Sequence, residues 1–127
     1  MYSVSVKLGF TASHYLIGGD WGPENTLNSH FYEVEALLEG PELDQHGYLV
    51  DITAVRAALA EARGRYASET LNHLPEFEGL NPSVEHFARI LWEFIAERIP
   101  TDALTAMSVR VREGDDAWAS LRREILH

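Results

Sequence analysis

Apolar and polar residues alternate with a period of two over residues 2–13, a pattern typical of a half-buried β-strand. The apolar positions there are Tyr2, Val4, Val6, Leu8 and Phe10. The same alternation returns over residues 30–38 and again over residues 104–112. A loop rich in Gly, Pro and Asn at residues 15–27 separates the first two of these segments, and Gly40-Pro41 ends the second. The pattern therefore predicts three strands.

Two other segments carry apolar residues at helical spacing. The first follows Asp51, a suitable N-cap, and we expect it to end near Gly64. The second opens at Pro82-Ser83 and extends toward Pro100. The apolar positions are Ile52, Val55, Leu59 and Ala62 in the first helix, and Phe87, Ile90, Leu91, Phe94 and Ile95 in the second. The tail after Gly114 fits either a helix or a short strand.

Two long strands, two consecutive helices and a returning strand indicate an α+β fold with the helices layered on one face of a sheet. The chain has 127 residues, enough for one hydrophobic core, and we expect a single domain over residues 1–127. No internal repeat or linker interrupts this pattern.

Charge and composition exclude several classes of function. Ten Lys and Arg residues against 20 Asp and Glu residues give a formal net charge of −10, which disfavours binding to nucleic acid or to an anionic membrane. The absence of cysteine excludes disulfides, zinc–thiolate sites, iron–sulfur clusters and a Cys nucleophile. No apolar run reaches membrane-spanning length and no signal peptide is recognisable, so we expect a cytoplasmic protein.

Six short motifs then follow one another along the chain. They are F-T-A-S-H at residues 10–14, N-S-H-F-Y at 28–32, G-Y-L-V-D at 47–51, L-N at 71–72, P-S-V-E at 82–85 and V-R-E at 111–113. In this order they resemble the family of 6-pyruvoyl- and 6-carboxytetrahydropterin synthases, which carries F-x-A-A-H, C-x-x-x-H-G-H-x-Y, G-x-v-x-D-F, L-N, P-T-x-E and v-x-E at these places. The resemblance covers roughly residues 4–119. It implies the tunnelling fold (T-fold), in which an antiparallel sheet carries two helices on one face. Subunits of that fold join their strands into a barrel, typically a homo-hexamer made of two trimers.

The resemblance also implies a zinc ion held by three histidines. His14 and His30 occupy two of those positions here, but Asn28 occupies the third. An amide oxygen is a poor substitute for imidazole on Zn²⁺, and two histidines seldom hold zinc unless Glu24 or another carboxylate supplies a third ligand. We therefore expect no tightly bound zinc and no other cofactor, with the two histidines as polar residues of a pocket.

The catalytic positions implied by the resemblance also differ. The family's Cys lies four residues before the first histidine of H-G-H, where this chain has Glu24, and its Asp-His pair corresponds to Ala67 and Ser68. We therefore expect the family's synthase reaction to be lost. Some members of the family carry Glu at the Cys position and cleave the pterin side chain by a retro-aldol reaction, but they keep the zinc site. His73 is a second candidate base, although a single loop histidine is more often a solvated surface residue.

The ligand-recognition positions remain. Glu113 corresponds to the carboxylate that hydrogen-bonds the 2-amino group and N3 of the pterin ring, and a carboxylate suits two parallel N–H donors. Ser83 and Glu85 correspond to a second ring-contacting segment, although an N-cap and a favourable charge in the first helical turn would explain them equally. For Glu113 the alternative is an ion pair with Arg110 or Arg112 of a neighbouring subunit.

Three hypotheses of function follow. The first is a module that binds a small pterin-like ligand without the family's reaction. The second is an enzyme of altered chemistry, a lyase or aldolase acting on a dihydropterin through Glu24 or His73. The third is a structural homo-oligomer whose pocket is vestigial. Retention of Glu113 and Glu85 favours the first two.

Overall fold

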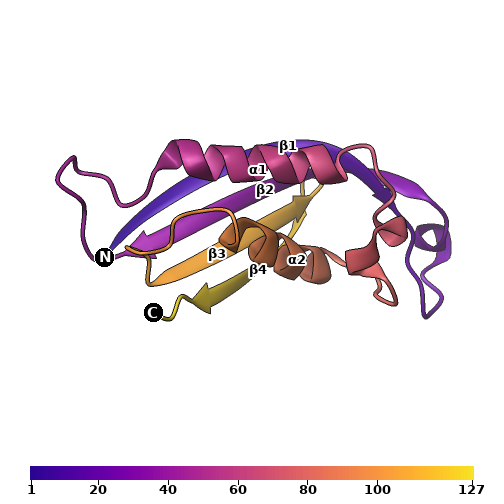
Figure 1. Ribbon diagram of the computed structural model, residues 1–127. Coiled ribbons are helices and arrows are strands. Elements are labelled where there is room, and N and C mark those ends of the chain that lie inside the picture. The colour runs from indigo at the N-terminus through magenta and orange to yellow at the C-terminus, as the bar shows by residue number, and fades with distance from the viewer.

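The computed structural model describes all of residues 1–127, which form a four-stranded antiparallel sheet with two helices on one of its faces (Figure 1). The strands lie in the order β1-β2-β3-β4. Their bounds are β1 Tyr2–His14, β2 Asn28–Gly40, β3 Ala106–Glu113 and β4 Ala117–Glu124. The predicted α+β class with both helices on one sheet face is thus confirmed.

The helices are α1, Ile52–Tyr66, and α2, Val84–Ala96. Helix α1 packs on β1, and α2 packs on β3 and β4, so the two helices cover the sheet side by side (Figure 1). Both have side-chain N-caps. The Asp51 carboxylate accepts a hydrogen bond from the backbone N–H of Thr53 at 2.9 Å, and the Ser83 hydroxyl accepts one from the N–H of His86 at 3.1 Å. These bonds satisfy N–H groups that have no partner within the helix.

The core lies between the sheet and the helices and contains 25 buried residues. Each strand turns the apolar side chains of one of its faces into this core. Helix α2 contributes Phe87, Ile90, Leu91 and Ile95 to it. Phe87 is central because its ring packs edge-on against both Tyr32 and Tyr66, with ring centroids 5.3 and 5.2 Å apart. Buried aromatic surface of this kind is a main source of folding free energy.

The ends of both helices differ from the sequence prediction, and β2 and β3 differ from their predicted ranges by about two residues at an end. Helix α1 continues through Gly64 to Tyr66, because Tyr66 is buried in the core and holds the last turn in place. The left-handed residue that follows the helix is Ser68, with a φ of 64°. The second helix ends at Ala96 rather than near Pro100. The tail left open between helix and strand is strand β4.

The strands are staggered at one end of the sheet. Strand β3 ends at Glu113, which pairs with Tyr32, and the N–H of Gly114 still donates to the carbonyl of Phe31 at 3.0 Å, so residues 28–30 of β2 bond to β1 alone. On the other side of β1 lies the loop after α1, where the N–H of Ser68 donates to the carbonyl of Thr11 at 2.7 Å and Ser13 N–H to the carbonyl of Glu69 at 2.9 Å. We call residues 11–14 and 28–30 the two-stranded extension. Neither helix is both long and apolar enough to cross a membrane.

Candidate functional site

Four titratable side chains meet at the two-stranded extension. His14 ends β1, His30 lies near the start of β2, Glu113 ends β3, and Glu24 lies in the short 3-10 helix η1, Gly22–Asn25. One potential ligand atom from each of the four lies within 4.8 Å of the others. We call this group the His–Glu cluster. Three strand ends and one loop thus build a single polar site, in which Glu113 is far away in the sequence from the other three residues.

His14 is the most deeply buried member, with a side chain 2% exposed. Its Nδ1 shares a hydrogen bond of 2.8 Å with the hydroxyl of Tyr32, while its Nε2 is buried without any hydrogen-bond partner. Burial lowers the pKa of His14, although the charges of Glu113 and Glu24 oppose this effect. Burial and the same two charges raise the pKa of Tyr32, which keeps its phenol protonated. Burial therefore favours the uncharged imidazole, and one of its ring nitrogens faces the cluster unpaired.

Glu24 reaches the cluster because its loop is held by hydrogen bonds. The Asn25 amide accepts from Trp21 N–H at 2.7 Å and donates to the carbonyl oxygens of Leu16 and Gly19. The carbonyl oxygen of Glu24 itself accepts from Leu16 N–H at 2.9 Å. The Glu24 carboxylate then lies 3.7 Å from His14 Nε2, and its side chain is 46% exposed. Glu24 is therefore the member of the cluster that lies nearest to solvent.

The shortest contact between a histidine and a carboxylate of the cluster joins His30 and Glu113. Glu113 Oε1 lies 3.1 Å from His30 Nε2 and 4.0 Å from His14 Nε2, and its side chain is 18% exposed. The Asn28 amide donates to the carbonyl oxygens of His14 and Thr26, which directs its Oδ1 toward His30 Nε2. His30 Nε2 thus faces two oxygen acceptors, while a neutral imidazole nitrogen can donate at most one proton.

The residues at this position fit a divalent metal ion, but with a ligand set different from three histidines. Ligands of a tetrahedral ion at ordinary bond lengths lie about 3.4 Å from one another, close to the separations of 3.1, 3.7 and 4.0 Å in the cluster. The unpaired, buried Nε2 of His14 is the observation that supports the fit. The expectation of no tightly bound zinc rested on the lack of a third ligand, and two carboxylates lie where such a ligand would be needed.

The other sequence candidates lie outside the cluster. The Ser83 hydroxyl caps α2, and Glu85 in the first turn is exposed. Neither forms a hydrogen bond or ion pair with the cluster. His73 is exposed and lies edge-on to Tyr15, with ring centroids 6.3 Å apart. Ser68, beside Ala67, is bound to the outer edge of β1 through Thr11.

Within the chain, no arginine or lysine pairs with Glu113. Arg110 lies on the opposite face of the sheet, where its guanidinium contacts the carboxylate of Glu35 at 2.8 Å. By strand alternation Arg112 shares that face. The ionisable side chains in contact with Glu113 are therefore the two histidines.

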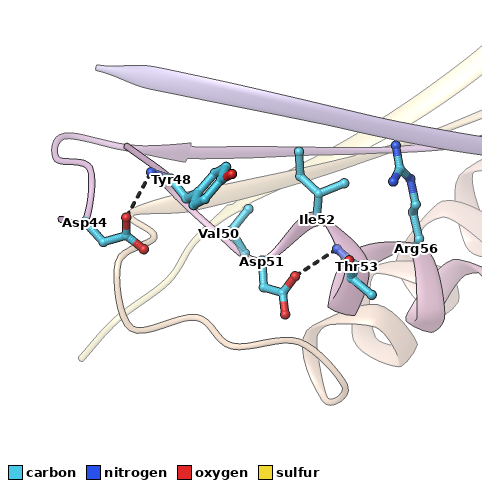
Figure 2. A pocket seen from close by; sticks show the side chains of 7 residues that line it. All are labelled: Asp44, Tyr48, Val50, Asp51, Ile52, Thr53 and Arg56. Atoms are coloured by element: carbon cyan, nitrogen blue, oxygen red, sulfur yellow. Dashed lines mark hydrogen bonds between the residues drawn. The ribbon is translucent and has the colours of Figure 1, made fainter. Parts of the chain in front are cut away.

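A hollow of about 480 Å³ lies at the other end of the sheet, between the loop after β2 and the start of α1 (Figure 2). Its acidic groups already serve local structure, since Asp44 accepts from Tyr48 N–H and His46 N–H, and Asp51 caps α1. Accepting these backbone hydrogen bonds lowers the pKa of Asp44. Nothing in this hollow points to a ligand.

Two supporting residues escaped the sequence reasoning. Tyr32 was part of the strand pattern, but nothing in the sequence showed that its hydroxyl would meet His14; only the register that places it beside Glu113 does so. Asn72 belongs to the L-N motif, and its amide both accepts from Tyr15 N–H and donates to the Tyr15 carbonyl oxygen, at 3.0 and 2.9 Å. These paired bonds fix the chain just after His14.

Comparison with known proteins agrees with this architecture. The chain superimposes on a 6-pyruvoyl tetrahydropterin synthase from Caenorhabditis elegans with a TM-score of 0.84, at 16% identity, covering 96% of this chain and 95% of that one. A Plasmodium vivax 6-pyruvoyltetrahydropterin synthase, a variant with its catalytic glutamate replaced by alanine, gives a TM-score of 0.77 at 16% identity, covering 98% and 100%. The fold is therefore that of the tunnelling-fold proteins.

The family can be stated more narrowly. The model of the 6-pyruvoyl tetrahydropterin synthase family matches residues 3–124. A putative 6-carboxy-5,6,7,8-tetrahydropterin synthase of Archaeoglobus fulgidus is 23% identical over 120 residues, covering 94% of this chain and 95% of that protein. The chain belongs to the 6-pyruvoyl tetrahydropterin synthase family, as its motifs led us to expect.

Proposed function

We propose that this chain binds a pterin-like heterocycle through Glu113 and does not carry out the family's zinc-dependent synthase reaction. The observation that carries the proposal is the environment of the Glu113 carboxylate, namely its burial and its neighbours. It is four-fifths buried at the end of a core strand, and its ionisable neighbours in the chain are histidines rather than a structural Arg or Lys. A carboxylate held in this way can accept the paired N–H donors of a 2-amino heterocycle.

The loss of the synthase reaction rests on the catalytic positions. The chain has no Cys, and Ala67 and Ser68 stand where the family resemblance implies Asp and His. Neither an alanine methyl nor a serine hydroxyl can replace the imidazole of an Asp-His pair as a general base near neutral pH. Glu85, exposed at the start of α2 beside Ser83, remains a candidate for a second contact to the ligand.

The direct test is calorimetric titration of the protein with a panel of oxidised and reduced pterins. We expect micromolar binding that falls roughly 10-fold or more in Glu113→Gln, since one charged hydrogen-bond acceptor is lost. Glu78→Gln is the matched control, because Glu78 is an exposed loop glutamate. Equal affinity in Glu113→Gln and the wild type would show that Glu113 is not the anchor.

A second candidate function is cleavage of a dihydropterin side chain, favoured by the position of Glu24 against His14. In this retro-aldol step the Glu24 carboxylate takes the proton of a side-chain hydroxyl, and the adjacent C–C bond breaks. The departing fragment gains a carbonyl, the electron pair passes into the ring C=N bond, and the proton returns to the retained fragment. The similar P. vivax 6-pyruvoyltetrahydropterin synthase also has a catalytic glutamate.

Product analysis after incubation with a dihydropterin distinguishes ligand binding without reaction from cleavage of the side chain. Cleavage that is present in the wild type and in His73→Asn but absent in Glu24→Gln would support Glu24 as the base. Cleavage lost only in His73→Asn would assign the role to His73, the other candidate base. Binding without any product would leave the binding module as the function.

We also propose a homo-oligomer, a hexamer of two trimers, in which strands of neighbouring copies pair. Residues 2–10 of β1 and all of β4 present free outer edges of the sheet, and such edges are normally covered. Sedimentation at micromolar concentration tests this, and a monomer would contradict it. A homo-oligomer that binds no pterin would instead be the structural protein with a vestigial pocket.

A further inference from the structure

We infer that the pterin-like ligand of this site carries no phosphate, and that Glu24 is the residue that selects an unphosphorylated, hydroxyl-bearing side chain. The inference rests on the proposed function, because it names the class of ligand that the same site would take. Glu113 keeps its role as the acceptor for the heterocycle. What is new is the role of Glu24, with His14, toward the rest of the ligand.

No basic side chain occurs in the segments that build the site. There is no Lys or Arg in residues 8–55, which include the site ends of β1 and β2 and the loop between them, nor in residues 66–88 or 113–121. Phosphate groups in protein sites are normally held by Lys, by Arg or by a helix N-terminus. At the N-terminus of α2, the Ser83 hydroxyl already caps the helix and Glu85 adds a negative charge. The site therefore lacks the groups that would bind a phosphate.

The ten Lys and Arg residues of the chain are placed away from the cluster. Seven of them form ion pairs with glutamates outside it. The other three are Arg56, Arg63 and Arg112. Arg56 lines the hollow at the other end of the sheet, and Arg112 lies on the sheet face away from the helices. Arg63 lies beside Leu8, which is about 20 Å from His14 along β1.

The charge of the cluster disfavours an anionic ligand. Glu24 and Glu113 have ligand atoms within 4.8 Å of each other, and neither pairs with a Lys or Arg. With both imidazoles neutral, the four side chains sum to a charge of about −2. A phosphate monoester carries about −1.5 to −2 near pH 7, so it would be repelled at this distance. A divalent ion bound among these side chains would bring their sum to about zero, and the site would still lack a basic side chain.

Glu24 and His14 both lack the partners that hydroxyl groups supply. The Glu24 carboxylate can only accept hydrogen bonds, and His14 Nε2, at 3.7 Å, is too far away to donate one. His14 Nε2 is itself buried and unpaired. If Nε2 carries the proton, one ligand hydroxyl can accept from it and donate to Glu24. If it does not, two neighbouring hydroxyls can donate to Nε2 and to Glu24, one each, whereas a phosphate dianion has no proton to donate.

Glu24 is placed to meet the outer part of a ligand. Its side chain is 46% exposed, against 18% for Glu113, so the heterocycle anchor lies deeper and Glu24 lies nearer to solvent. The loop is fixed on both sides of Glu24, because Asn25 accepts from Trp21 N–H and the Thr26 hydroxyl donates to the carbonyl oxygen of Pro23 at 2.7 Å. A carboxylate held in this way can discriminate between side chains of different charge.

The test compares three pterins that differ only in the side chain: one with a trihydroxypropyl group, its phosphate monoester, and one with a methyl group. Calorimetric titration of the full-length protein as isolated measures the three affinities. We expect the trihydroxypropyl pterin to bind at least about 10-fold more tightly than the monoester, and several-fold more tightly than the methyl compound. Added salt should narrow the first ratio, because it screens the repulsion of the phosphate.

Substitutions of Glu24 test its part in the selection. The affinity ratio of the trihydroxypropyl pterin to its monoester should fall roughly 3-fold or more in Glu24→Gln, and further in Glu24→Lys, which adds a positive charge. Glu78→Gln and Glu78→Lys change the net charge equally at an exposed loop position and should leave the ratio unchanged. Since both affinities are measured on the same variant, a general weakening does not alter the ratio, and thermal unfolding shows that each variant is folded.

Three results would overturn the inference and leave the proposed function standing. The first is binding of the monoester as tightly as the trihydroxypropyl pterin, or more tightly. The second is an affinity ratio that stays the same in both Glu24 variants, which would show that Glu24 does not select. The third is equal affinity for the methyl and trihydroxypropyl compounds, which would show that the hydroxyl groups are not recognised. If none of the three pterins binds, the proposed function is wrong and the inference falls with it.

Discussion

Glu76 and Glu113 are both largely buried carboxylates beside the aromatic core, yet their surroundings differ. Glu76 is 24% exposed and accepts three hydrogen bonds, two from the Arg65 guanidinium at 2.6 Å and one from the Tyr66 hydroxyl at 2.7 Å. These bonds from Arg65 and Tyr66 lower the pKa of Glu76 to about 2. Glu113 is 18% exposed and faces only histidine nitrogens.

The difference separates a structural carboxylate from a functional one. Glu76 accepts three hydrogen bonds within the chain, out of about four that a carboxylate can accept, so it stabilises the fold and has little acceptor capacity left for a ligand. Glu113, together with Glu24, is left with unsatisfied acceptors, which favours a partner from outside the chain. Phe87 joins the two regions because it packs on Tyr66 on one side and on Tyr32 on the other.

Phe87→Ala should produce the largest effect and affect both regions together. Truncation of a fully buried aromatic ring typically costs about 3–5 kcal/mol of unfolding free energy. Urea unfolding at pH 7 measures this loss, and Phe87→Leu should lose less because it leaves a smaller cavity. A loss under about 1 kcal/mol for Phe87→Ala would mean that the ring does not link the two regions.

Glu76→Gln should lower the unfolding free energy at pH 7 by about 1–2 kcal/mol, a value reduced for solvent screening because Arg65 is 40% exposed. The pKa of Glu76 is lower in the folded than in the unfolded state, so its contribution is complete above its ordinary value of 4.5 and is lost as the pH falls toward about 2. Urea unfolding between these pH values should show a step in the wild type. The step should persist in Glu78→Gln and disappear in Glu76→Gln.

Tyr66→Phe should cost about 1 kcal/mol, since it removes one hydrogen bond to Glu76 and keeps the ring in the core. Tyr48→Phe is the matched control because Tyr48 is exposed and its hydroxyl has no hydrogen bond in the structure. Equal losses in both variants would contradict a specific role for the Tyr66 hydroxyl.

Glu113→Gln and Glu24→Gln should change the unfolding free energy of metal-free, pterin-free protein least, by less than about 0.5 kcal/mol or toward greater stability. Each substitution removes one of two carboxylates that repel each other and that no cation of the chain pairs. A loss above about 1 kcal/mol would show that these carboxylates are structural, as Glu76 is. Thermal and urea unfolding both report the change.

The strands and helices could largely be predicted because burial on one face imposes a periodicity on the sequence. The prediction was wrong or left open where tertiary contacts decide. Gly64 did not end α1 because Tyr66 is anchored in the core, and the tail became a strand because β3 presents an edge to it. The site could be predicted only as separate residues. His14, His30, Glu24 and Glu113 were each singled out, but their convergence depends on strand register and on the loop that carries Glu24.

The two-stranded extension has a consequence for local dynamics. Its β2 segment lacks β3 as a neighbour, and its β1 segment is held from outside by the loop after α1 and by Asn72. A segment with few neighbours opens at a lower free energy than the whole molecule, so its amide protons should exchange with solvent ahead of those of the four-stranded part. An occupant of the cluster would tie β1, β2, β3 and the Glu24 loop together and slow this exchange. Hydrogen exchange at Ser13 should therefore report occupancy of the site whatever the occupant is.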